Sequence, residues 1–437
     1  MSTRRTTQIF CASTLYGAVT IAAALDSGCF PTADRRILLV TNNAAVPETT
    51  PPLDEAEGFD RLRGRFDSVL SWNETISPLH PGGWTPRPSD LPLLQRHLRK
   101  LWDLGDDRVE LALESPQVTP ALAIAQLLPD APITVYADGL MSYGPTRNKI
   151  DPLIGGRVGR LLHLDLVPGL APLLLAEFGA VAETVPTEAF TKVVEELTGP
   201  AAAEEGPALL LGQYLAALNL LTAAEEEELH LRMVRGAIAL GHRRLVFKPH
   251  PTAPDAWSRT LVREAADLGA ELTVEDRPVL AEVLYGELRP ALVVGCFSTA
   301  LLTARTFYGL PVARVGTGTL LERLTPFQNS NRIPLTVVDA VVPPLEDGET
   351  AAAEIGTDQL NDLVAAVGFA MQPKIRPELR EPAVRHLSGP LAERTRHHFT
   401  RRRLTVLNLP GGIPLPRHPQ VRRLARRALR LRRALKR

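Results

Sequence analysis

The chain has 437 residues, 45% of them hydrophobic and 22% charged, and its formal net charge at pH 7 is zero. This composition excludes a disordered or fibrous protein, and the length exceeds what one hydrophobic core usually supports, so we expect two globular domains. No run approaches the roughly 18 apolar residues of a membrane-spanning helix, and no signal-peptide pattern follows Arg4 and Arg5. The three cysteines, few and odd in number, favour a reduced, cytoplasmic protein over a disulfide framework.

The first half of the chain alternates between predicted strands and helices. An apolar helix is expected to end near Leu25, and further helix patterns cover residues 91–101 and 120–128. In the last of these, Thr119 is the expected N-cap and Pro120 the first helical residue. Buried strands are expected at residues 6–13, 37–41, 68–72, 109–113 and 133–136. Strands that are apolar almost throughout and that are separated by helices indicate a parallel sheet covered on both faces.

A second set of alternating elements begins after residues 199–206, a segment rich in Ala, Glu and Gly that is the expected linker. A capping box at Thr222 and Glu225 opens a helix that runs to about Leu240. Strands are expected at residues 208–211, 245–247, 271–274, 291–294 and 312–315. The predicted fold class is therefore α/β, with two tandem doubly wound, Rossmann-like domains that face a cleft. The expected units are an N-terminal domain (1–200), a C-terminal domain (201–372), helices packing across both domains (373–408) and a basic tail (409–437).

One strand end in the second domain predicts half of a phosphate site. The strand that ends at Phe247 is followed by Lys248, His250 and Pro251, which offer a cation and an imidazole on a backbone restricted by prolines. Ligands of open parallel sheets bind outside the carboxyl ends of the strands, so we expect His250 to face the ligand. Strand alternation makes Lys248 the weaker candidate, and a purely structural loop histidine is the alternative for His250.

A second strand end completes this predicted site. It carries Gly295, Ser298 and Thr299 and leads into a helix. The glycine lets the backbone approach a ligand closely, and the two hydroxyls lie beside the free N–H groups of a helix start, which bind anions. An ordinary helix N-cap is the alternative, but capping and phosphate binding are compatible because one hydroxyl and several N–H groups remain available.

Polar residues also follow strands of the first domain. Asp138, which precedes a glycine, follows the last predicted strand and offers a carboxylate that can deprotonate an acceptor hydroxyl. Ser115 and Gln117 follow the strand before it, and Asn42 follows an earlier one, so all three are candidate sugar-binding residues on the acceptor side. Turn and loop roles are the alternatives at each of these positions.

These motifs, in this order, resemble those of the bacterial α-2,8-polysialyltransferase-like family of sialyltransferases, whose two Rossmann-like domains form the GT-B fold. The acidic-Gly motif falls on Asp138, the His-Pro motif on His250 and the Ser-Ser/Thr motif on Ser298, and the layout fits roughly residues 6–340. The resemblance implies an inverting, metal-independent glycosyltransferase that moves sialic acid, or a related nonulosonic acid, from a CMP-activated donor to a glycan acceptor. Polysialic acid is one such product, and capsule or surface-glycan biosynthesis the corresponding process.

The resemblance also implies roles for the motif residues. Asp138 would be the general base on the acceptor hydroxyl, and His250 would stabilise or protonate the departing CMP phosphate. Ser298 and Thr299 would hold that phosphate. The family usually has two acidic residues before the glycine of the first motif, whereas here Ala137 occupies the first of these positions.

Further candidates lie on the nucleotide side. Glu282 follows Pro278 as in the family's Pro-x-x-x-Glu stretch, which implies a position near the nucleotide ribose. Gly212 and Gln213 follow the first strand of the second domain and are additional donor-binding candidates. The chain has no Asp-x-Asp pair at a strand end and no Cys/His spacing typical of a metal site, so we expect neither a metal nor another cofactor. A monophosphate leaving group also needs less charge neutralisation than a diphosphate.

The zero net charge hides an asymmetry along the chain. No Asp or Glu follows Glu393, whereas 15 Lys or Arg do, which leaves 34 basic against 49 acidic residues before it. Residues 417–437 contain 10 basic residues interleaved with apolar ones, a pattern typical of an amphipathic helix on an anionic membrane surface. We therefore expect peripheral contact with the inner membrane face, with a solvated tail as the alternative. Nucleic-acid binding is disfavoured because the rest of the chain is acidic and aromatic residues make up only 5%.

Two other functional classes stay open at the level of sequence. A UDP-sugar-using GT-B transferase or a nucleotide-sugar epimerase would keep the layout and change the donor. A non-catalytic nucleotide- or glycan-binding relative would keep the fold around a decayed site, and Ala137, in place of the family's first acidic residue, keeps this class open. A preference for CMP or UDP separates the first class from a sialyltransferase, and binding without transfer identifies the second.

Overall fold

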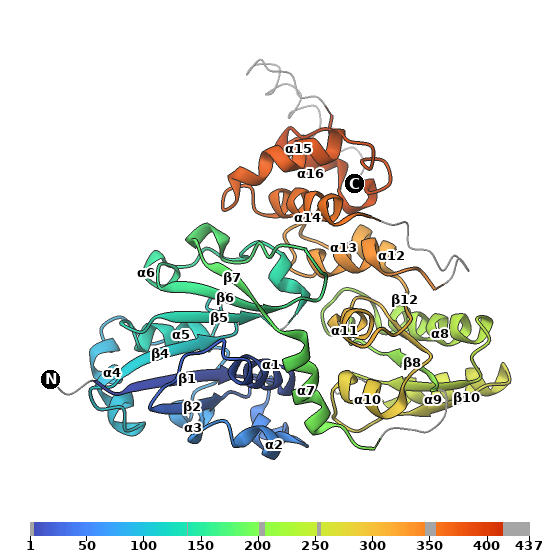
Figure 1. Cartoon of the computed structure of the whole chain (residues 1–437). Helices are drawn as coiled ribbons and strands as arrows, with labels where there is room; N and C mark the ends of the chain where they lie inside the picture. Colours follow the sequence, from blue (N-terminus) through green and yellow to red (C-terminus); the bar gives the residue numbers. More distant parts are fainter. Residues whose placement is uncertain (1–3, 138, 201–205, 251–254, 346–354, 414–437) are drawn as a thin grey trace.

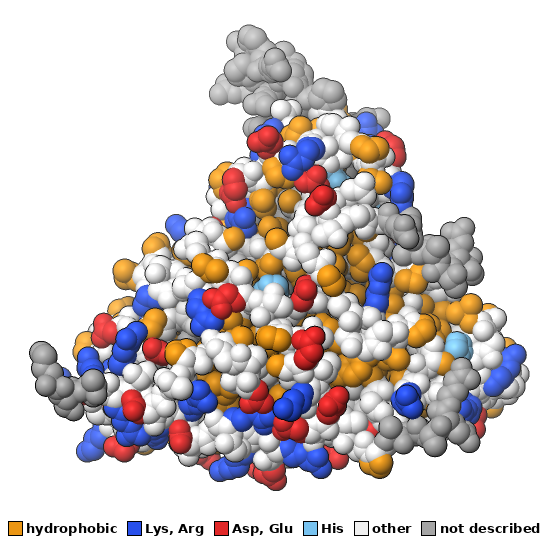
Figure 2. Space-filling view, viewed as in Figure 1, with side chains coloured by type: hydrophobic (Ala, Val, Ile, Leu, Met, Phe, Trp, Pro, Cys, Tyr) orange, Lys and Arg blue, Asp and Glu red, His pale blue; other side chains and the backbone are white. Residues whose placement is uncertain are grey.

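The computed structural model describes residues 4–137, 139–200, 206–250, 255–345 and 355–413. Two parallel sheets lie side by side, each with its own helices, and a group of C-terminal helices lies above both of them (Figure 1). This is the predicted pair of Rossmann-like domains in an α/β chain. On the face shown in Figure 2, hydrophobic side chains gather along the junction of the two domains.

The first sheet has seven parallel strands in the order β3-β2-β1-β4-β5-β6-β7. The strands are β1 (Thr6–Ala12), β2 (Arg35–Val40), β3 (Ser68–Ser71), β4 (Arg108–Leu113), β5 (Ile133–Ala137), β6 (Val158–Leu164) and β7 (Val181–Val185). The first five match the predicted strands, whereas β6 and β7 were not predicted. The helices of this domain are α1 (Leu15–Asp26), α2 (Phe59–Arg63), α3 (Trp72–Ile76), α4 (Leu91–Leu101), α5 (Ala121–Leu127), α6 (Pro152–Gly155) and α7 (Thr187–Leu197).

Alternate residues of the buried strands pack on opposite faces of this sheet. In β1, Phe10 belongs to the core that contains Phe59 of α2 and Phe190 of α7. Its neighbour Ile9 belongs to a separate core with Trp72 of α3. Two apolar faces of one sheet therefore need two layers of helices, which is the doubly wound architecture.

The start of α5 differs from the prediction. Pro120, not Thr119, occupies the N-cap position of the helix. The hydroxyl of Thr119 instead donates a hydrogen bond to the carbonyl of Gly82, at 2.6 Å. The helix begins one residue later than expected. The hydroxyl of Thr119 therefore does not cap the helix and instead holds the loop that contains Gly82.

The second sheet has five parallel strands in the order β10-β9-β8-β11-β12. The strands are β8 (Ala208–Leu211), β9 (Arg244–Lys248), β10 (Glu271–Val274), β11 (Leu292–Gly295) and β12 (Val312–Arg314), as predicted within one or two residues. Its helices are α8 (Ala223–Ala239), α9 (Asp255–Asp267), α10 (Ala281–Leu288) and α11 (Thr299–Tyr308). The capping box of Thr222 and Glu225 is present at the start of α8 and confirms that prediction.

Contacts between the domains are direct. The rings of Phe190 on α7 and Phe307 on α11 lie 5.6 Å apart in an edge arrangement. The hydroxyl of Thr306 donates to the carbonyl of Leu166 at 2.9 Å. Where the chain passes from the first domain to the second, the N–H of Gly199 donates to the carboxylate of Glu287 on α10, at 3.1 Å.

Helices at the end of the described chain bridge the two domains. They are α12 (Thr317–Arg323), α13 (Arg332–Val341), α14 (Thr357–Met371), α15 (Arg380–Ser388) and α16 (Arg401–Leu407). The side-chain amide of Asn361 on α14 donates to the carbonyl of Gly169 at 3.0 Å, and that of Gln372 donates to the carbonyl of Arg147 at 2.7 Å. These two bonds join α14 and the residue that follows it to the first domain. No helix in the described part is both long and apolar enough to cross a membrane.

Candidate active site

A pocket of about 680 Å³ lies where the carboxyl ends of the two sheets meet. In the first sheet the strand order reverses direction between β1 and β4, and in the second between β8 and β11. Loops that leave neighbouring strands at such a point diverge and leave a crevice. The pocket is lined by residues that follow β1, β4 and β5 on one side and β8, β9 and β11 on the other.

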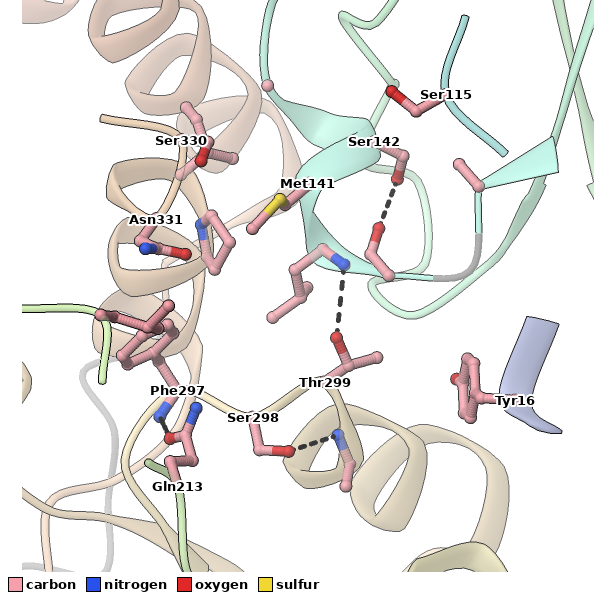
Figure 3. A pocket seen from close by; sticks show the side chains of 18 of the residues that line it. Tyr16, Ser115, Met141, Ser142, Gln213, Phe297, Ser298, Thr299, Ser330 and Asn331 are labelled. Carbon is pink, nitrogen blue, oxygen red and sulfur yellow. Dashed lines mark hydrogen bonds between the residues drawn. The ribbon is translucent and has the colours of Figure 1, made fainter. Parts of the chain in front are cut away.

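The turn between β11 and α11 forms the donor wall of the pocket (Figure 3). Ser298 is the N-cap of α11, and its hydroxyl accepts a hydrogen bond from the N–H of Ala300 at 3.3 Å. Thr299 is the first residue of the helix and also lines the pocket. The side-chain oxygen of Gln213 accepts a bond from the N–H of Phe297 at 2.9 Å, so the loop after β8 fixes this turn. The arrangement presents two hydroxyls and a helix N-terminus to an anion.

His250 reaches the same pocket from another strand end of the second sheet. It follows β9, lines the pocket, and has its ring 6.3 Å from that of Tyr214. The surrounding protein desolvates the imidazole of His250 and lowers its pKa. Pro251 lies outside the described residues.

Lys248 does not line the pocket. Its ammonium group donates to the carbonyl of Arg277 at 3.1 Å, and burial lowers its pKa although the charge of Glu275 acts in the opposite direction. The side chain points to the neighbouring strand end, as the alternation along β9 predicts. Lys248 therefore acts on the pocket only through its charge.

Two of the predicted donor-side residues, Gly212 and Gly295, are glycines, so they have no side chain that could contact a ligand. Gly212 lies so close to β9 that an added Cβ would meet the ring of Phe247 at 2.8 Å. Gly295 ends β11 and is buried, and it does not line the pocket. Gly212 thus allows its loop to pack closely against β9, whereas a Cβ on Gly295 would make ordinary contacts with Leu301 and Leu211.

Glu282 lies on the floor of the pocket. It is 2% exposed, and its carboxylate accepts a hydrogen bond from the hydroxyl of Thr303 at 2.6 Å. Burial raises the pKa of this carboxyl, and the bond from Thr303 only partly offsets the effect. Glu282 thus ties α10 to α11.

On the acceptor side the structure brings some predicted residues to the pocket and not others. Ser115 and Gln117 line it, and the amide oxygen of Gln117 accepts a bond from the backbone N–H of Arg147 at 2.7 Å. Asn42 does not line it, because its amide donates to the carbonyls of Pro47 and Thr50 and holds the loop after β2. Asp138 lies outside the described residues, although Ala137 and Gly139 on either side of it line the pocket.

Two charged residues of the pocket were missed by the sequence analysis. Glu114 directly follows β4, and its carboxylate accepts a bond from the hydroxyl of Ser13 at 3.1 Å. Burial raises the pKa of this carboxyl. Its position at a strand end is the same signal that identified Ser115, so it could have been found. Arg147, whose guanidinium donates to the hydroxyl of Ser330 at 3.1 Å, lies in a loop without any pattern to mark it.

The pocket joins the motifs of both domains, and comparison with known proteins identifies their family. A model of the family described as alpha-2,8-polysialyltransferase matches residues 8–317. The chain belongs to this family. No curated protein matches the sequence. The polysialyltransferase family assignment makes the protein a glycosyltransferase, with a nucleotide-sugar donor and a glycan acceptor, and its two sheets form the predicted GT-B fold.

Solved glycosyltransferases resemble this polysialyltransferase-family protein at low identity. A mutant of the Thermobaculum terrenum O-GlcNAc transferase has 14% identity and a TM-score of 0.37, over 90% of this chain and 66% of the other. Acinetobacter baumannii MurG has 12% identity and a TM-score of 0.40, over 90% and 97% of the two chains. TcCGT1 in complex with UDP has 9% identity and a TM-score of 0.44, over 87% and 93%.

Proposed function

We propose that this glycosyltransferase transfers sialic acid, or a related nonulosonic acid, from a CMP-activated donor to a glycan hydroxyl, with inversion and without a metal ion. The observation that supports this best is that His250, Ser298 and Thr299 line one pocket although they follow two different strands. An imidazole, two hydroxyls and a helix N-terminus suit a single phosphate group. The opposite wall carries Glu114 and the residues that flank Asp138.

In the proposed reaction, the acceptor hydroxyl gives its proton to the carboxylate of Asp138 while its oxygen attacks the anomeric carbon of the donor. The bond between that carbon and the phosphate oxygen breaks on the opposite side, and its electron pair leaves with CMP. His250 stabilises or protonates the departing phosphate, and Ser298 and Thr299 donate hydrogen bonds to it. Attack and departure on opposite sides invert the anomeric centre.

Independence of metals follows from the charge of the leaving group. A monophosphate leaves with less negative charge than a diphosphate, and the described donor wall already offers an imidazole and hydroxyl donors to it. The two carboxylates among the described lining residues, Glu114 and Glu282, lie in different domains and at different walls. We therefore expect full activity in EDTA.

The test is incubation of the full chain with CMP-sialic acid and an acceptor panel, with CMP release and product mass as readouts. CMP release that depends on acceptor, that persists in EDTA and that is lost in His250→Ala supports the proposal. A thermal shift with UDP and none with CMP would identify the UDP-sugar class instead. Binding of CMP without transfer or donor hydrolysis would identify a non-catalytic relative.

We also propose that the basic tail holds the enzyme on an anionic membrane surface. Residues 417–437 lie outside the described structure, so this proposal rests on their sequence: 10 basic residues in 21, with apolar residues between them. Basic residues gain on the order of 1 kcal/mol each near anionic lipid. Deletion of residues 417–437 should abolish co-sedimentation with vesicles that contain anionic lipid, and unchanged binding would contradict the proposal.

A further inference from the structure

Two histidines and an aspartate meet away from the pocket, where α13 contacts the last part of the described chain. Asp339 lies on α13, and His397 and His398 lie in the short helical turn η6 (Arg396–His398) that precedes α16. Within the described ranges, they are the one group of three His, Cys, Asp or Glu side chains whose ligand atoms all lie within 4.8 Å of one another. None of the three lines the pocket of the proposed reaction.

The two oxygens of the Asp339 carboxylate have different partners. Oδ1 accepts a hydrogen bond from the hydroxyl of Thr317 at 2.6 Å and lies 3.1 Å from the guanidinium of Arg314. Oδ2 lies 2.7 Å from Nε2 of His397 and 3.5 Å from Nε2 of His398. In metal sites the ligating carboxylates are themselves held by hydrogen bonds in this way. Oδ2 is therefore the oxygen that can bind an ion together with the two imidazoles.

His398 is buried with an unsatisfied ring nitrogen. The residue is 1% exposed, and its Nδ1 has no hydrogen-bond partner in the part of the chain that the structure describes. Its ring lies beside that of His397, with the two ring centroids 4.1 Å apart. Buried polar groups normally have partners, so this imidazole needs an explanation. A cation beside Asp339 would give the ring the strong partner that it lacks.

The spacing of the three side chains suits a zinc ion. Ligand atoms at about 2.0–2.1 Å from a tetrahedral Zn²⁺ lie about 3.3 Å from each other, which is close to the 3.5 Å between His398 and Asp339. The 2.7 Å between His397 and Asp339 is shorter than ligation allows, but the side chain of His397 is 44% exposed and has room to move outward. Two imidazoles and a carboxylate leave the fourth position of the ion to water.

We propose that Asp339, His397 and His398 bind one Zn²⁺ and that this ion joins α13 to the C-terminal helices. Asp339 and His397 are 58 residues apart, so the ion closes a long loop of the chain. Ile333 and Pro334 at the other end of α13 line the pocket, so the ion holds in place a helix that forms part of the pocket wall. Its role is structural, and the proposed transfer reaction does not use it.

The sequence predicted no metal because this site has no local signal. Adjacent histidines with a distant aspartate match no ligand spacing typical of a zinc site. Only the packing of η6 against α13 brings the three side chains together.

The experiment is titration calorimetry of the full, untagged chain with ZnCl₂ at pH 7.5, where imidazoles can bind a metal, after treatment with EDTA and its removal. We expect one Zn²⁺ per chain. Excess MgCl₂ should not compete, because Mg²⁺ prefers oxygen ligands. Zinc at about 100 times its Kd should raise the melting temperature by at least about 2 °C, because it binds the folded chain.

His397→Gln removes one ligand at an exposed position, so the fold is expected to be retained. The variant should bind zinc at least about tenfold more weakly and should lose the rise in melting temperature. His97→Gln is the matched control, because His97 is an exposed histidine on α4 and does not belong to the cluster. It should leave both values unchanged.

The outcomes separate this inference from the proposed function. Absence of zinc binding by the wild-type chain overturns the inference, and so does binding that is equally tight in His397→Gln. Acceptor-dependent CMP release at 25 °C should be the same with zinc and with EDTA, and a requirement for zinc would overturn the purely structural role. Absence of CMP release under both conditions overturns the proposed function and leaves the zinc site intact.

Discussion

The backbone N–H of Leu140 donates a hydrogen bond to the hydroxyl of Thr299 at 3.5 Å (Figure 3). Leu140 follows the predicted base motif of the first domain, and Thr299 begins the helix of the predicted phosphate site in the second. The two motifs are thus in contact across the domain junction. Gly139 leaves little room there, because an added Cβ would lie 3.1 Å from the hydroxyl oxygen of Thr299.

Replacement of Thr299 by Val should lower kcat/KM for the donor by roughly 10- to 100-fold, the cost of losing a hydrogen bond to a charged group. Thr299→Ser keeps the hydroxyl and should retain most of the activity. Both values come from initial rates of CMP release. Equal losses in the two variants would show that the methyl group, and not the hydroxyl, is required.

Binding of CMP should take up protons at pH 7. Desolvation by the surrounding protein lowers the pKa of His250, and a phosphate beside the ring favours the charged imidazole and raises the pKa again. Titration calorimetry in two buffers with different ionisation enthalpies measures this uptake. His250→Asn should abolish it, and identical enthalpies for the wild-type protein in both buffers would contradict the assignment.

Glu282 and Glu275 should affect the pH dependence of stability in opposite directions. Burial raises the pKa of Glu282 in the folded state, so its ionisation costs stability as the pH rises above its unfolded value of 4.5. The hydrogen bond from Arg277 lowers the pKa of Glu275, so its contribution is present above pH 4.5 and is lost as the pH falls through the lowered value.

Urea unfolding at pH 5 and pH 8 measures both effects. Glu282→Gln should gain stability relative to the wild-type protein as the pH is raised. Glu275→Gln should be less stable than the wild-type protein at both values. A Glu282→Gln variant whose relative stability falls at pH 8 would show that its ionised carboxylate is stabilised by the fold.

Replacement of Arg332 by Met should lower the free energy of unfolding by about 2–4 kcal/mol without changing the catalytic mechanism. Arg332 is 1% exposed and donates to the carbonyls of Leu324 and Phe327 at 2.7 and 3.0 Å, which would lose their partners. Arg323→Met is the control. Its guanidinium is half-exposed and paired with Glu225, so about 0–1 kcal/mol is expected.

The fold could be predicted because its strands are buried on both faces and therefore apolar throughout. The two strands that were missed depart from this pattern, since β7 has mostly exposed residues and β6 contains Arg160 and His163. The bridging position of α14 depends on contacts with Gly169 and Arg147, which are distant in sequence and leave no local signal.

The residues of the donor wall could also be predicted, because they follow strands that the sequence reveals. Ser298 follows β11, next to the point where the order of the second sheet reverses, and His250 follows β9, one strand away from that point. Asn42 follows β2, which is equally far from the reversal in the first sheet, but its amide is bonded to the carbonyls of Pro47 and Thr50 within its own loop, which the strand pattern does not reveal. Arg147 lies in a loop held by Gln117, Ser330 and Gln372, which are distant in sequence from it.

Two segments of the chain cross between the domains. One lies at Gly199, which is bonded to Glu287, and the other includes α14 and Gln372, which are bonded to Gly169 and Arg147 (Figure 1). The bond between Leu140 and Thr299 adds a link beside the pocket itself, so any movement that separates these two pocket walls has to break it.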